Sequence, residues 1–188
     1  MALSEVSPDA LAVVVVEAVL DQIDELALTL LPRQRWLALR GVERGRATAE
    51  QRRALVLDTP LGRTVRDLAR YAQTGDGLPA WEVPAAILGV ELALLGRAAD
   101  QVEGGIARVA ADGRLPEAVR VVVLAADARL GVERGRAVSA MGFAVLAGLS
   151  VKEVEGQFGA CVDAETAEAW LRRRRVVGFG VGAHARQV

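Results

Sequence analysis

The heptapeptide GVERGRA occurs twice in this chain, at residues 41–47 and again at residues 131–137. The same offset of 90 residues aligns the short apolar stretches 54–56 and 144–146, which follow the two copies. A sequence that repeats at a fixed spacing is typical of a duplicated structural unit. The repeat therefore predicts two related halves, which we place at residues 1–90 and 91–188.

The composition of the 188 residues favours helices in both halves. Ala, Val and Leu dominate the apolar residues, which make up 52% of the chain, whereas aromatic residues make up 4%. Small and aliphatic side chains suit the packing of helices better than that of an aromatic-rich β-sandwich. We expect an all-α protein, a helical bundle in which each half carries a helix-turn-helix-like unit.

Prolines, glycines and capping residues divide the chain into predicted helices. The apolar run 121–124 has the composition of a buried strand, but its helical flanks favour a helix. Apolar and glycine residues alternate at 176–182, which is compatible with a short C-terminal β-hairpin, a wing, or with a glycine-rich tail. The predicted helices span residues 8–31, 32–40, 48–57, 64–73, 79 or 84 to 111, and 116–130.

Residues 149–175 have the pattern of two short helices joined by a turn. Ser150 can cap the first helix, and Gly159 permits the turn. The stretch resembles the helix-turn-helix of DNA-binding transposases, recombinases and small bacterial regulators. The resemblance implies that the second helix enters the major groove and that residues 172–175 contact phosphates. The side chains expected to anchor the two helices are Val151, Val154, Phe158, Thr166, Trp170 and Leu171.

The same stretch departs from that pattern in two ways. Its turn is about two residues longer than usual, with Ala160 and Cys161 as the excess. Asp163, Glu165 and Glu168 stand at the start of the second helix, where base contacts are normally made and where carboxylates repel phosphates. A structural or protein-binding helix pair is therefore an alternative interpretation of these residues.

Positive charge is confined to two segments, although the net charge of the chain is only −1. Residues 32–70 carry ten arginines and four acidic residues, and residues 172–188 carry five arginines and no acidic residue. Clustered arginines can neutralise phosphates. For the first segment, a solvated face with ion pairs to acidic neighbours is the alternative. The candidate DNA-binding residues are Arg44, Arg46, Arg52, Arg53, Arg63, Arg66, Lys152, Arg172, Arg173, Arg174, Arg175 and Arg186.

The sequence offers little for catalysis or for metal binding. Cys161 is the only cysteine and His184 the only histidine, so an intramolecular disulfide and a Cys/His metal cluster are excluded. GVERGRA lacks the frame of a phosphate-binding loop, and we interpret it mainly as a connection between helices. We expect a protein that is not an enzyme and that has no cofactor.

The predicted partners are DNA and a second copy of the chain. Residues 11–31 are apolar but are interrupted by acidic residues, so we expect no signal peptide, no transmembrane helix and a cytoplasmic location. The apolar face of this first helix predicts a homo-oligomer, a dimer. The leading hypothesis is a bacterial or phage DNA-binding protein, a transcriptional regulator or a mobile-element accessory factor. The alternative is a non-enzymatic α-helical scaffold or adaptor.

Overall fold

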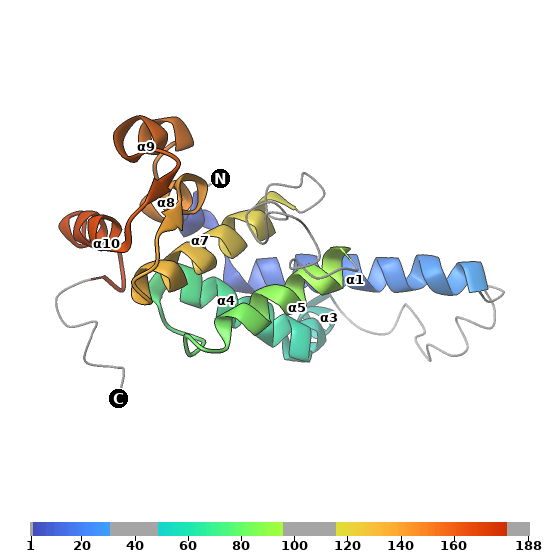
Figure 1. The fold of residues 1–188 in the computed structure, drawn as a ribbon. Helices are drawn as coiled ribbons and strands as arrows, with labels where there is room; N and C mark the ends of the chain where they lie inside the picture. Colours follow the sequence, from blue (N-terminus) through green and yellow to red (C-terminus); the bar gives the residue numbers. More distant parts are fainter. Residues whose placement is uncertain (1, 31–48, 96–115, 180–188) are drawn as a thin grey trace.

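The computed structural model describes residues 2–30, 49–95 and 116–179, and within these ranges the protein is mostly helical (Figure 1). The expected all-α class is confirmed, because the described residues add only one two-stranded sheet to the helices. In chain order the elements are the 3-10 helix η1 (Leu3–Glu5), α1 (Pro8–Leu30), α3 (Ala49–Asp58), α4 (Pro60–Thr74), α5 (Val83–Leu95), α7 (Glu117–Glu133), β1 (Val138–Ser139), α8 (Ala140–Ala147), α9 (Val151–Phe158), β2 (Cys161–Val162) and α10 (Ala164–Arg173).

Helices α1, α3, α4 and α5 and most of α7 form a helical bundle, the larger part of the molecule (Figure 1). Helix α4 shows how the sequence produces this packing, because its apolar residues recur at helical spacing on one face. Except for the partly buried Leu61, these residues are buried, and they meet apolar side chains of α1, α5 and α7 in a first core cluster. Members of this cluster include Val65, Leu68, Ala69, Ala72, Leu11, Val15, Ile87, Val90 and Val122.

Helix α4 begins at Pro60, earlier than the predicted start at residue 64. Thr59 caps it, since the backbone N–H of Gly62 donates to Thr59 Oγ1 at 3.0 Å and Pro60 suits the first helical position. The hydroxyl of Thr59 donates in turn to the carbonyl of Val56 at 2.7 Å. Thr59 therefore ends α3 and starts α4, rather than only breaking a helix.

Helix α7 belongs to two hydrophobic cores. Val122 and Leu130 pack in the first cluster, whereas Ala128 and Val132 pack in a second cluster with the C-terminal elements. The prediction of a helix at residues 121–124 is confirmed, and α7 is buried on most of its circumference. The first GVERGRA copy lies outside the described residues, so the duplication into two halves stays a prediction.

A C-terminal unit of β1, α8, α9, β2 and α10 packs at one end of the bundle (Figure 1). Its second core cluster centres on Phe143, which is 0% exposed. The ring of Phe143 makes edge-to-face contacts with Phe158 and Trp170, at centroid distances of 5.8 and 5.6 Å. Contacts of this geometry favour a fixed arrangement of α8, α9 and α10.

The small sheet lies elsewhere than the hairpin considered for residues 176–182. Strand β1 pairs antiparallel with β2, with Val138 opposite Val162 and Ser139 opposite Cys161. Residues 176–179 contain no strand, and the rest of that stretch lies outside the described residues. Among the helices that the structure describes, none is long and apolar enough to cross a membrane.

Candidate nucleic-acid interface

Helix α9 begins and ends as the sequence predicts. The N–H of Glu153 donates to Ser150 Oγ at 3.2 Å, and the N–H of Ser150 donates to Glu153 Oε2 at 2.8 Å, which completes a capping box. Gly159 follows the helix with φ 83° and ψ −165°, a conformation that essentially only glycine adopts. The chain can therefore turn sharply away from α9 toward β2.

The two residues in excess of a usual helix-turn-helix connection serve the small sheet. The carbonyl of Ala160 accepts a hydrogen bond from the N–H of Ala140 at 2.9 Å, and Cys161 is the first residue of β2. The longer turn therefore ties the helix pair to the start of α8. Helices α8, α9 and α10 thus form a three-helix unit, in which α9 and α10 are consecutive helices joined by a turn and by β2.

The acidic residues at the start of α10 have structural roles that the sequence did not reveal. Asp163 is the N-cap, because the N–H of Thr166 donates to its Oδ1 at 2.8 Å, and these hydrogen bonds lower the pKa of its carboxyl. Glu168 forms an ion pair with Arg172 at 2.7 Å, one turn further along the helix. The start of α10 is nevertheless acidic, which opposes its insertion beside phosphates.

The four arginines predicted to contact phosphates lie at the other end of α10, and all are exposed. Arg172 is paired with Glu168, and the guanidinium of Arg174 lies 5.3 Å from the centroid of the Trp170 ring. Arg173 and Arg175 have no ionic partner among the described residues. The positive charge that remains available for a ligand is therefore concentrated on these two side chains.

The second GVERGRA copy forms the last turn of α7 and the turn into β1. A Cβ on Gly131 would lie 2.6 Å from Val138 Cγ1, so this glycine allows α7 and β1 to approach closely. Gly135 has φ 68°, and the N–H of Arg136 donates to the carbonyl of Gly131 at 2.8 Å. The repeat acts here as a connection, in agreement with its interpretation from the sequence.

This turn adds two exposed arginines that were missing from the predicted interface, Arg134 and Arg136. Arg134 Nη2 donates to the carbonyl of Ala80 at 3.0 Å, which fixes the turn against the segment between α4 and α5. The signal was present in the sequence, because both arginines belong to the repeated heptapeptide.

Arg129 fixes the segment that follows α10 against the bundle. The guanidinium is 0% exposed, and Nη2 donates to the carbonyls of Val177 at 2.8 Å and of Gln73 at 3.3 Å. Nε donates to the carbonyl of Ala72 at 3.2 Å, and the group lies 4.5 Å from the centroid of the Phe179 ring. Residues 173–177 and 134–136 are consequently held at the same end of the molecule (Figure 1).

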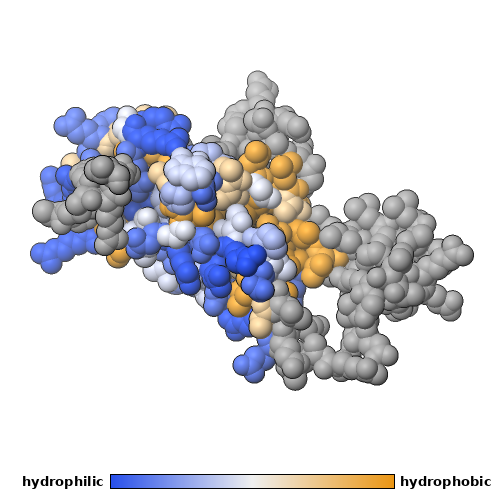
Figure 2. Space-filling view, turned by 90° about the horizontal axis from the view of Figure 1, so that it is seen from below, coloured by the Kyte–Doolittle hydropathy of each residue, from blue (hydrophilic) through white to orange (hydrophobic). Residues whose placement is uncertain are grey.

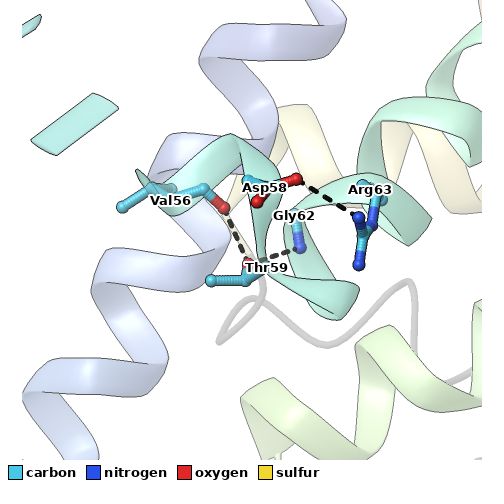
Figure 3. Close-up of polar contacts among 5 residues, drawn as sticks. All are labelled: Val56, Asp58, Thr59, Gly62 and Arg63. Atoms are coloured by element: carbon cyan, nitrogen blue, oxygen red, sulfur yellow. Dashed lines mark hydrogen bonds and ion pairs between the residues drawn. The ribbon is translucent and has the colours of Figure 1, made fainter. Parts of the chain in front are cut away.

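The first basic segment contributes to a different part of the molecule. Arg63 on α4 forms an ion pair with Asp58 at 3.2 Å, beside the Thr59 cap (Figure 3). Arg53 on α3 is exposed, and Arg66 is half-buried with a buried Nε that has no partner within the described residues. Helix α3 lies at the end of the bundle opposite to α10 (Figure 1). The structure therefore does not bring these two groups of arginines together.

The remaining residues of the predicted interface are Lys152, Arg52, Arg44, Arg46 and Arg186. Lys152 is exposed on α9. Arg44, Arg46 and Arg186 lie outside the described residues, and the side chain of Arg52 is not among those described. Within the described part of the chain, no group of three or more His, Cys, Asp or Glu side chains is placed to hold a metal ion.

Comparison of the chain with protein-family models, with curated proteins and with solved structures found no match.

Proposed function

We propose that the C-terminal unit binds nucleic acid through phosphate contacts made by arginines at the end of α10 and on the turn between α7 and β1. One observation carries this proposal. The end of α10, which carries Arg173 and Arg175, lies at the same end of the molecule as the turn between α7 and β1, which carries the exposed Arg134 and Arg136 (Figure 1). Exposed guanidinium ions grouped in this way are suited to a chain of phosphates.

The helix-turn-helix order of α9 and α10 favours a DNA duplex as the ligand. The distribution of charge along α10 favours a particular orientation, because its N-terminal part carries Asp163 and Glu165 while its C-terminal end carries the arginines. Phosphate contacts position a protein on a duplex without reading its sequence. We therefore propose contacts from the C-terminal end of α10, and a role in DNA organisation or regulation that depends on charge more than on base recognition.

Titration of a fluorescent DNA duplex at several salt concentrations tests this proposal. Binding through phosphates predicts an affinity that falls steeply with salt, with a slope of about −0.9 in log–log form for each phosphate neutralised. The double variant Arg173→Ala/Arg175→Ala should bind more weakly and with a slope shallower by about 2. Arg63→Ala is the matched control, because Arg63 is paired with Asp58 at the other end of the bundle. Absence of duplex binding at low salt would contradict the proposal.

A second candidate function, self-association as a helical scaffold, is favoured by the surface of the bundle. The C-terminal part of α1 extends beyond the other described helices (Figure 1). Apolar side chains gather on one side of the bundle (Figure 2), and Val14 of α1 and Leu92 of α5 are 47% and 43% exposed. Light scattering after size exclusion should report a dimer for this candidate. A monomer at all concentrations tested would rule it out.

A further inference from the structure

Glu91 lies on the face of α5 that packs into the core of the bundle. Its side chain is 0% exposed, as buried as its neighbours Ile87 and Val90, which are 1% exposed. Neither Oε1 nor Oε2 has a hydrogen-bond partner within the part of the chain that the structure describes. Removing a carboxylate from water without providing a donor is unfavourable, whereas a protonated carboxyl group carries no charge to solvate.

The charge that acts on Glu91 makes ionisation still less favourable. Helices α1, α4 and α7 pack against α5. Among the described side chains of these helices, Asp127 of α7 is the one whose charge affects Glu91, and it has the same sign. Burial first, and then Asp127, raise the pKa of Glu91 to about 7. Burial also raises the pKa of Asp127, although the positive charge of Arg136 opposes this shift.

We propose that the buried carboxyl group of Glu91 is a proton-binding site in the core of the bundle, and that loss of its proton weakens the packing of α5 against the neighbouring helices. The site differs from the proposed nucleic-acid interface, and it does not depend on that function. The proton makes the carboxyl group of Glu91, which has no hydrogen-bond partner among the described residues, a neutral side chain in the apolar core.

The sign of the resulting pH dependence follows from the proton balance between the folded and unfolded chains. Glu91 has a higher pKa in the folded protein than the ordinary value of 4.5, so between these values the folded state binds more protons than the unfolded state. The contribution of Glu91 to the free energy of unfolding should therefore be greatest below about pH 4.5. It should fall as the pH rises to about 7 and change little above that value.

Two measurements on the full chain test the site. In the first, the ¹³C resonance of the Glu91 carboxyl group is followed during a pH titration. A midpoint near 7 is expected, and a midpoint below 5 would overturn the proposal. This measurement uses the unaltered protein and does not depend on the folding of a variant.

The second measurement compares urea unfolding of the unaltered chain and of Glu91→Gln between pH 4.5 and pH 8. The neutral glutamine should lower the unfolding equilibrium constant relative to the unaltered chain, by about twofold at pH 4.5 and on the order of 100-fold at pH 8. Glu155→Gln is the control, since Glu155 is exposed on α9, and it should show no such trend. If the ratio of the unfolding equilibrium constants of the unaltered chain and of Glu91→Gln stays constant over this pH range, the proposal is overturned.

Discussion

The bundle and the C-terminal unit handle charged side chains in opposite ways. The bundle encloses Glu91 and Arg129, each 0% exposed, among apolar residues. The described part of the C-terminal unit buries no charged side chain, and it uses Glu153 and Asp163 at its surface as helix caps. A buried charged group makes stability depend on distant partners and on protonation, whereas a cap depends mainly on residues within one turn.

The different placement of charged groups also implies that the two regions respond differently to pH. Surface caps leave the shape of the C-terminal unit insensitive to moderate changes of pH, which suits a constant binding surface. The bundle contains the groups whose ionisation is costly, so conditions such as pH should act on the molecule mainly through the bundle.

The largest expected effect comes from Arg129→Met, which keeps much of the side-chain volume and removes the guanidinium. The carbonyl of Ala72 then loses its donor in a buried place, and those of Gln73 and Val177 lose theirs in partly buried ones, so we expect a loss of stability of about 3 to 5 kcal/mol. Chemical denaturation measures this loss, with the exposed Arg53→Met as control. A loss below about 1 kcal/mol would mean that the guanidinium of Arg129 contributes little to the stability of the bundle.

A smaller effect is expected where the two regions meet, for Gly131→Ala. The added Cβ would lie 2.6 Å from Val138 Cγ1, so α7 and β1 must separate slightly, at a cost of about 1 to 3 kcal/mol. Gly156→Ala is the matched control, because nothing lies within 4 Å of a Cβ at this position in α9. The control should be neutral or stabilising, by up to about 1 kcal/mol. Equal effects at both glycines would contradict the close approach of α7 and β1.

Thr59→Ala tests whether the bundle too relies on a local cap. The variant removes the hydroxyl that accepts from the N–H of Gly62 and donates to Val56, and it should cost about 1 kcal/mol in thermal or urea unfolding. Thr59→Ser keeps the hydroxyl and should retain most of the stability. If both variants lose the same amount, the methyl group matters more than the cap.

The smallest effect, and the one that contrasts most directly with Glu91, concerns Asp163→Asn. The cap lowers the pKa of Asp163 below its ordinary value of 3.8, so it stabilises the fold above that pH, and this stabilisation is lost as the pH falls through the lowered value. The unaltered chain should therefore lose more stability on acidification than the variant does. Unfolding curves between pH 2 and pH 6 show whether the sign is opposite to that of Glu91.

The sequence predicted those parts of the fold that depend on short-range signals. Ser150 and Glu153 are three residues apart and form a capping box, so the start of α9 could be predicted from the pattern. The helical flanks of residues 121–124 outweigh the strand-like composition of this run, so α7 could be predicted.

The features that escaped prediction depend on contacts between distant residues. Arg129 binds carbonyl groups 48 to 57 residues away, and nothing near it in the sequence distinguishes it from a surface arginine. In the sequence, Asp163 stands out as a charge that repels phosphates, although its position before α10 also allows a cap. The grouping of Arg134 and Arg136 with the end of α10 required the packing of α7 against α10, which no local pattern encodes.

The shared helix α7 has a consequence for how the molecule unfolds. Because Leu130 belongs to the first core cluster and Val132, two residues later, to the second, neither cluster can lose its packing on α7 without disturbing the other. The bundle and the C-terminal unit should therefore behave as a single cooperative unit, with one transition seen by every probe. Amide hydrogens in α7 would exchange only through that global opening, so the most protected part of the chain would be the helix that directly precedes the turn bearing Arg134 and Arg136.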